Sequence, residues 1–110
     1  MADDATQLRK GVLELAILAL LSRGPMYAVE IISTLASKPG LAAKPGTVYP
    51  LLARLDKNGA VKASWQASPS GSPRKYYRLT AKGKTALRAQ ATAWREMTSA
   101  IESIMGGPHD

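Results

Sequence analysis

The sequence lacks cysteine altogether and has a single histidine, His109. Without cysteine the chain has no disulfide, no thiolate zinc site and no cysteine nucleophile. Three acidic residues, Glu14, Glu30 and Asp56, fall on three separate predicted helices, with no nucleophile or metal-ligand spacing around them. We therefore expect a protein that is not an enzyme and that has no metal and no cofactor.

A long hydrophobic run is also missing. The stretch from Val12 to Leu21 has ten residues and contains Glu14, whereas a membrane-spanning helix needs about 20 apolar residues. Asp3 and Asp4 precede it, so the basic start of a signal peptide is lacking as well. We expect a cytoplasmic protein without a membrane partner.

Acidic residues are nearly absent from residues 44 to 88, where Asp56 stands against ten lysines and arginines. The remainder of the chain has five basic and seven acidic residues, so the net charge of +7 comes entirely from this one segment. A field of one sign over a short segment favours a polyanionic partner.

Hydrophobic periodicity predicts three helices in the first half of the chain. The first is expected from Thr6 to Ser22; it is apolar on nearly every side, which indicates that a second chain packs on it. The second is expected from Tyr27 to Ser37. The third is expected to have Thr47 as its N-cap and Pro50 in its first turn, and to end at Asn58-Gly59.

The second half predicts a hairpin followed by a long helix. One strand has Val61, Ala63 and Trp65 on its buried face, the tip runs from Ser68 to Pro73, and the return strand alternates through Lys75, Tyr77 and Leu79. Thr80 is the expected N-cap of a helix that ends near Met105, and Gly83 in its first turn indicates a close backbone contact. Leu87, Trp94 and Ile101 recur every seven residues along that helix, the spacing of a helix–helix seam.

This order of elements predicts a mainly α fold with a small β-hairpin wing, namely a winged helix-turn-helix followed by a C-terminal dimerisation helix. One domain is expected over residues 1–110. Its predicted parts are a DNA-binding region at 6–80, the dimerisation helix at 81–105 and a tail at 106–110.

Several motifs make the chain resemble the PadR-like transcriptional regulators, in particular the short members with one C-terminal helix. They are Leu8-Arg9-Lys10-Gly11, Gly24-Pro25-Met26-Tyr27, Gly46-Thr47-Val48-Tyr49-Pro50-Leu51-Leu52 with Arg54-Leu55, Asn58-Gly59, and the run from Ser70 to Thr80 with Gly83. The resemblance implies a homodimer that binds double-stranded DNA at an inverted-repeat operator as a repressor, and that in many members is released by a small aromatic or hydrophobic ligand. Ala28 and Val29 depart from the family pattern, which places glycine and then an aromatic residue there.

The predicted DNA-binding residues lie on the third helix, on the wing and at the start of the chain. Arg54 suits either a guanine edge or a phosphate, and the sequence leaves both roles open. For Arg9 and Lys10, a position over DNA phosphates is implied only by the resemblance, in which a dimer would bring them there. The full set is Arg9, Lys10, Thr47, Tyr49, Arg54, Ser70, Gly71, Ser72, Arg74 and Lys75.

The predicted dimer interface joins the first and last helices. It consists of Leu13, Ile17, Leu87, Ala91, Trp94, Met97 and Ile101. Trp94 has two compatible roles, as dimer core and as one of a pair of indoles that sandwich a flat ligand, so Trp94, Met97 and Leu13 form a candidate effector site. The main alternative function is a winged-helix module whose basic face binds an acidic protein without operator-specific DNA binding.

Overall fold

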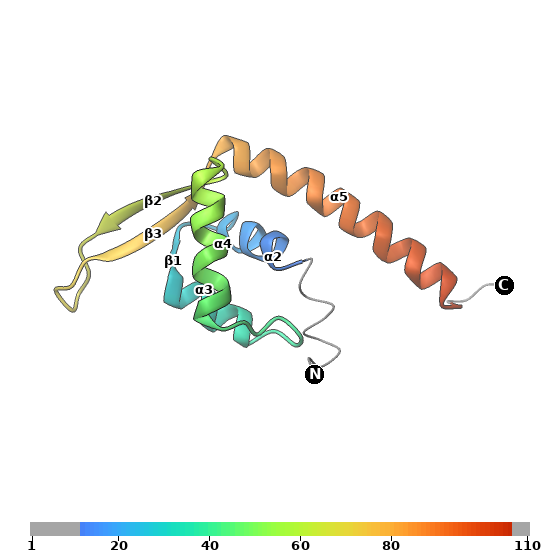
Figure 1. Cartoon of the computed structure of the whole chain (residues 1–110), viewed down its shortest axis with the longest axis horizontal. Coiled ribbons are helices and arrows are strands. Elements are labelled where there is room, and N and C mark those ends of the chain that lie inside the picture. The colour runs from blue at the N-terminus through green and yellow to red at the C-terminus, as the bar shows by residue number, and fades with distance from the viewer. Residues whose placement is uncertain (1–11, 107–110) are drawn as a thin grey trace.

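The computed structural model describes residues 12–106. Three helices and a three-stranded antiparallel sheet form the body, with a hairpin projecting from one side and a long helix running to the other (Figure 1). This arrangement confirms the predicted winged-helix fold. The elements are α2 (Leu13–Leu21), β1 (Met26–Tyr27), α3 (Ala28–Ala36), α4 (Pro45–Lys57), β2 (Val61–Gln66), β3 (Arg74–Leu79) and α5 (Ala81–Ile104).

Helix α2 crosses the centre of the body. It begins at Leu13, with Val12 as an N-cap that has no side-chain hydrogen bond; the predicted start at Thr6 lies outside the described residues. Its buried side chains include Ile17 and Leu18, both fully covered within this chain. The apolar character of α2 on several sides is thus explained largely by its packing on α3, β3 and α5 of the same chain.

Strand β1 was not predicted from the sequence. Met26 and Tyr27 pair with Tyr77 and Tyr76 of β3, which places β3 in the centre of the sheet. Tyr27 is also the N-cap of α3, and its backbone N–H donates to the Glu30 carboxylate at 3.0 Å. A two-residue strand gives no alternation to detect, and only the partner strand reveals it.

The N-cap of helix α4 lies three residues before the expected one, at Lys44 in place of Thr47. Lys44 is the N-cap and Pro45 the first helical residue, so Thr47 lies inside the helix and the prediction that Thr47 caps it is wrong. Pro45 suits the first position because the backbone N–H that proline lacks has no partner there anyway. Pro50 consequently lies beyond the first turn, on the exposed side of α4.

The hairpin of β2 and β3 is half inside the body and half outside it. Val61, Tyr77 and Leu79 are buried as their alternation predicted, whereas Trp65 is 68% exposed. Trp65 lies opposite Lys75, towards the tip, where the hairpin has passed the helices (Figure 1). The alternation correctly assigned Trp65 to the same face of the hairpin as Val61. Near the tip, however, none of the helices that the structure describes packs against that face, so Trp65 is exposed.

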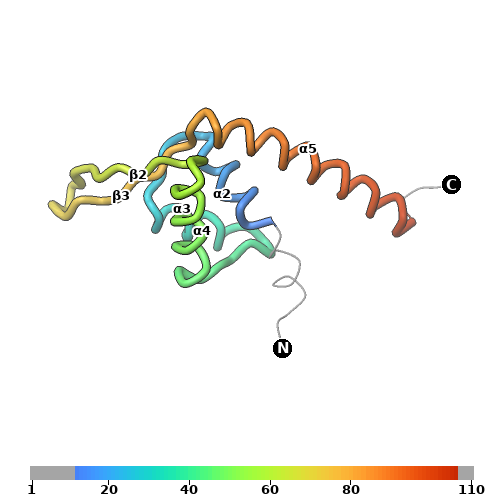
Figure 2. The backbone as a smooth tube through the Cα atoms, turned by 45° about the horizontal axis from the view of Figure 1, so that its top comes forward, coloured from blue at the N-terminus to red at the C-terminus, as the bar shows by residue number. Residues whose placement is uncertain are grey.

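Helix α5 begins as predicted and then leaves the body. The Gly83 N–H donates to the Thr80 side chain at 3.0 Å, and Gly83 itself is buried against the Ala60 backbone. Figure 2 shows the second half of α5 running away from the other elements. The radius of gyration, 15.9 Å, therefore exceeds the roughly 13 Å of a compact domain of about this length. Within residues 12–106 no helix is both long and apolar enough to span a membrane.

Candidate nucleic-acid interface

A cleft of about 280 Å³ opens where the wing meets α3 and α4. We call it the wing cleft. Tyr49, from the first half of α4, forms one wall, and Trp65 and Lys75 of the hairpin form the other. The lining residues are Tyr27, Ala28, Val29, Tyr49, Trp65, Arg74, Lys75 and Tyr77. Three of the predicted DNA-binding residues, Tyr49, Arg74 and Lys75, thus meet at one place.

Cations lie beside aromatic rings in the wing cleft. The Arg74 guanidinium is 4.5 Å from the centre of the Tyr27 ring, and the Lys75 ammonium is 5.9 Å from the centres of the Trp65 and Tyr77 rings. Such contacts hold a charged head group in place while leaving its donors free. The cleft therefore has two positively charged groups, those of Arg74 and Lys75, positioned at its surface by aromatic rings.

The tyrosine hydroxyl on the floor of the cleft stays neutral. Burial raises the pKa of Tyr77 above its ordinary value, and nearby Tyr49 and Asp56 act in the same direction. At neutral pH the hydroxyl is protonated, as tyrosine ordinarily is, so Tyr77 adds no negative charge to the cleft.

The wing tip is a short turn built from small residues. Gly71 has a φ of +89°, which a residue with a side chain rarely adopts, and its N–H donates to the Ser68 carbonyl at 3.0 Å. The Ser68 hydroxyl donates to the Ser72 carbonyl. Ser70, Gly71 and Ser72 are all exposed, so the tip offers small polar groups that can approach a nucleic-acid backbone closely.

Arg54, the predicted base reader, lies on another flank of α4. Its guanidinium forms an ion pair with Glu14 of α2 at 3.0 Å, and the Gln90 amide of α5 donates to the same carboxylate at 2.9 Å. Arg54 therefore faces α2 and α5, whereas Tyr49 faces the wing. Thr47 is exposed on α4 and contributes to neither cavity. The structure does not bring Arg54 together with the wing residues.

Two side chains of the wing cleft were missed in the sequence. Trp65 was expected to be buried, and Val29 was noted only as a departure from the family pattern; both are exposed beside Tyr49. The signal for Trp65 was its position near the tip, since a strand end close to a flexible turn has little core to pack against. Exposed apolar groups next to cations suit the sugars and base edges of a nucleic acid.

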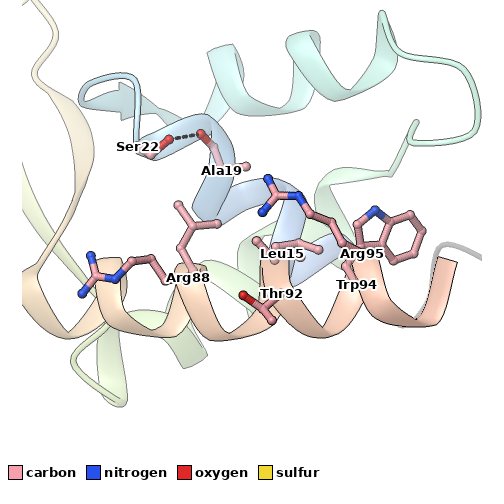
Figure 3. A pocket seen from close by; sticks show the side chains of 9 residues that line it. Leu15, Ala19, Ser22, Arg88, Thr92, Trp94 and Arg95 are labelled. Atoms are coloured by element: carbon pink, nitrogen blue, oxygen red, sulfur yellow. Dashed lines mark hydrogen bonds between the residues drawn. The ribbon is translucent and has the colours of Figure 1, made fainter. Parts of the chain in front are cut away.

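The predicted dimer interface needs a correction on α2. Leu13 is 4% exposed and Ile17 is fully covered, so both belong to the core of this chain and have no surface for a second one. The reason is register: Leu13 and Ile17 point inward, while Leu15 and Ala19 border α5. A groove of about 690 Å³ lies between α2 and α5, with Trp94 among its lining residues. Figure 3 shows Leu15 and Ala19 of α2 on the side that faces α5.

A second cavity, of about 320 Å³, gathers part of the candidate effector site. Trp94 and Met97 line it together, whereas Leu13 does not; Leu15 and Leu51 supply the other large apolar walls. Leu13, which was predicted with Trp94 and Met97, is therefore not part of this cavity. Arg9 and Lys10, also predicted to bind DNA, lie outside the described residues.

The far half of α5 has an exposed apolar face. Trp94, Met97 and Ile101 are about half exposed, and Ile104 is 82% exposed. These residues follow the seam predicted from the sequence. Trp94 and Met97 are partly covered where they share a cavity with Leu15 and Leu51, and Ile101 and Ile104 lie farther along the exposed end of α5. Leu87 and Ala91, nearer the start of α5, are half-buried against the body.

Comparison with known proteins gives a consistent picture. Residues 17–89 match the model of the transcriptional regulator PadR-like family. The transcriptional regulator Rv3488 of Mycobacterium tuberculosis is 35% identical over 71 residues, 64% of this chain and 63% of that protein.

Solved structures agree over nearly the full length. A PadR-like transcriptional regulator from Bacillus cereus superposes with a TM-score of 0.84 at 32% identity, covering 92% of this chain and 98% of that one. A PadR-like transcription factor from Bacteroides fragilis has a TM-score of 0.74 at 40% identity, covering 90% and 95%. The chain belongs to the PadR-like family, a family of DNA-binding transcriptional regulators and not of enzymes.

Proposed function

We propose that this protein is a homodimeric repressor that binds an inverted repeat in a promoter and is released by a small aromatic or hydrophobic ligand. The observation that carries the proposal is the separation of two surfaces. The wing cleft, with its held cations, lies on one side of the body, and the uncovered apolar face of α5 runs away on the other. One surface suits a polyanion and the other suits a second copy of the chain.

On DNA, α4 and the wing act together. The exposed face of α4 enters the major groove, as the second helix of a helix-turn-helix does. Arg74 and Lys75 contact phosphates along the adjacent backbone, and the tip at Ser70 to Ser72 reaches the neighbouring groove. Tyr49 and Trp65 lie between these parts and contact sugars or base edges.

Dimerisation uses α5 and the groove between α5 and α2. Trp94, Met97 and Ile101 of one chain pack against the partner, with Leu15 and Ala19 in place of Leu13 and Ile17. Two-fold symmetry makes the interface self-complementary and the DNA site palindromic. The two α4 helices then contact half-sites about one DNA turn, roughly 34 Å, apart.

The ligand site is proposed beside Trp94. The cavity of Trp94 and Met97 is apolar on most sides and also contains the Glu14 carboxylate and the Gln90 amide. A flat ring with one polar substituent fits this chemistry, because the ring buries against the indole and the substituent finds a hydrogen-bond partner. Binding there releases DNA by shifting the population of dimers whose two α4 helices are correctly spaced.

Removal of two wing-cleft side chains should weaken operator binding strongly. The double variant Trp65→Ala/Lys75→Ala loses an apolar contact and a phosphate contact, so we expect at least roughly a tenfold rise in Kd and a log–log salt slope smaller by about one for each lost phosphate contact. Both side chains are exposed, so the melting temperature should change by no more than a few degrees. Fluorescence anisotropy with operator DNA at several salt concentrations measures both effects.

Lys62→Ala is the matched control for that experiment. Lys62 is an exposed lysine of the same hairpin, opposite Arg78 in the register, and strand alternation places it on the other face of the sheet from Lys75. It should weaken binding only slightly through the net charge. Equal losses for Lys62→Ala and the double variant would refute the wing cleft as the contact surface.

A further inference from the structure

Glu14 connects three helices through one carboxylate. Its Oε1 accepts a hydrogen bond from Arg54 Nη2 at 3.0 Å, and its Oε2 accepts one from Gln90 Nε2 at 2.9 Å. Arg54 belongs to α4 and Gln90 to α5, while Glu14 itself is on α2. Each oxygen therefore serves a different helix.

The position of this contact on α5 is significant. Gln90 is half-buried, and the exposed apolar stretch of α5 begins soon after it, at Trp94. Glu14 thus binds α5 close to the point where that helix leaves the body. Within residues 12–106 the Arg54–Glu14 contact is the only ion pair, and no other side-chain hydrogen bond joins α5 to α2 or α4.

Stability alone is a weak explanation for the contact. The side chain of Arg54 is 62% exposed and that of Glu14 30% exposed, and ion pairs of this kind add little to folding because solvent screens them and side-chain entropy opposes them. Ile17 of α2 and Val48 and Leu52 of α4 already belong to one fully buried apolar core. The hydrogen bonds of Glu14 to Arg54 and Gln90 are directional. They can therefore fix the rotation of α4 and α5 relative to α2, which non-directional apolar packing does not fix.

We propose that Glu14 is a positioning residue that sets the orientation of α4 relative to α5. In the dimer proposed above, on which this inference rests, the two α5 helices hold the chains together, so the α4–α5 relation sets the spacing of the two reading helices. One added base pair moves a half-site by about 3.4 Å and turns it by about 35°. With the Glu14 bonds in place that change costs the dimer more free energy than it does without them.

The same network borders the proposed ligand cavity. Glu14, Arg54 and Gln90 line the cavity that also contains Trp94 and Met97. A molecule seated against Trp94 therefore competes for, or displaces, bonds that orient α4. Ligand binding in this cavity would therefore change the orientation of the reading helix α4 through these hydrogen bonds.

The test uses operator duplexes in which the distance between half-sites is changed by one base pair in either direction. For the unchanged protein we expect Kd to rise by about 5- to 150-fold on the altered spacings. Glu14→Met keeps a similar side-chain length but has no oxygen acceptor, so both bonds are lost; glutamine would not serve, because the Gln90 amide could turn over and accept from it. We expect it to lower the spacing discrimination about fivefold. Gln90→Ala, which removes only the α5 bond, should do the same.

Two further measurements separate positioning from folding. Binding to a single half-site should stay within about twofold of the unchanged protein, and the melting temperature should fall by no more than a few degrees, because an exposed pair contributes little to stability. Asp56→Asn is the matched control: it removes one negative charge from exposed α4, and Asp56 has no ion pair within the described residues. It should keep full spacing discrimination.

Full discrimination in both Glu14→Met and Gln90→Ala would overturn the role of Glu14 while leaving the proposed dimeric repressor intact. A loss of discrimination in Asp56→Asn equal to that in Glu14→Met would overturn it too, because general charge would then explain the effect. Equal affinity of the unchanged protein for all spacings would instead refute the dimer on an inverted repeat, and the inference about Glu14 with it.

Discussion

Gly83→Ala is expected to destabilise the protein by about 3 kcal/mol or more, one of the two largest effects of any single substitution considered. A Cβ at this position would lie 2.0 Å from the Ala60 carbonyl oxygen and 2.7 Å from a methyl group of Leu79. The Ala60 carbonyl cannot retreat easily, because it accepts a hydrogen bond from the Thr80 N–H at 3.1 Å and the adjacent Gly59 carbonyl accepts one from the Thr80 hydroxyl at 2.6 Å. Overpacking against fixed backbone costs more than overpacking against a mobile side chain.

Thermal unfolding followed by circular dichroism measures this effect, with an expected drop in melting temperature of roughly 10 to 20 °C. Gly46→Ala is the control. Gly46 lies in α4 with nothing within 4 Å of an added Cβ and no positive φ, so alanine should stabilise the helix by up to about 1 kcal/mol. A Gly83→Ala protein that melts like the unchanged one would show that the start of α5 is not packed on Ala60.

Trp94→Ala is expected to weaken dimerisation by about 3–5 kcal/mol, or roughly 150- to 5,000-fold in the dimer dissociation constant. Trp94 is 44% exposed in the single chain and lies where the groove between α2 and α5 meets the exposed apolar stretch of α5, in the middle of the proposed interface. A large aromatic group at the middle of an interface carries much of its binding energy. Sedimentation velocity across a range of concentrations should show a monomer where the unchanged protein is a dimer.

Trp65→Ala separates this effect from a general loss of tryptophan. Trp65 is more exposed than Trp94 but lies on the wing, so its loss should leave the sedimentation coefficient unchanged and weaken only DNA binding. Operator affinity should fall in Trp94→Ala as well, because two linked half-site contacts become one. A monomeric unchanged protein at micromolar concentration would contradict the proposed interface.

Local rules predicted most of the fold. The Thr80 cap, the Gly83 contact and the alternation of Tyr77 and Leu79 depend on near neighbours in the chain, and all three are confirmed. The elements that were missed depend on distant partners. Strand β1 forms because Met26 and Tyr27 pair with the edge of β3, which lies far away in the sequence. Helix α4 starts earlier than expected because Pro45 occupies its first position, which places Thr47 inside the helix.

The site was harder to predict than the fold. Periodicity places Arg54 on the outer side of α4, but only the packing of α2 and α5 puts Glu14 within 3.0 Å of it. Leu13 and Ile17 were expected at the interface because α2 is apolar on many sides, and its register against the core decides which side faces outward. By contrast, the charge bias of residues 44 to 88 can be read without knowledge of packing, and the structure brings Arg74 and Lys75 of that segment together in the wing cleft.

The central claim is sequence-specific binding of DNA. The most direct test is a fluorescence-anisotropy titration of the protein against the DNA upstream of its own gene and against a scrambled duplex of equal length, at two salt concentrations. We expect the upstream DNA to bind about a hundredfold more tightly than the scrambled duplex, with a log–log salt slope of roughly −5 or steeper for six or more phosphate contacts. Equal, weak and salt-insensitive binding to both duplexes would contradict the account and favour an acidic protein as the partner of the basic surface.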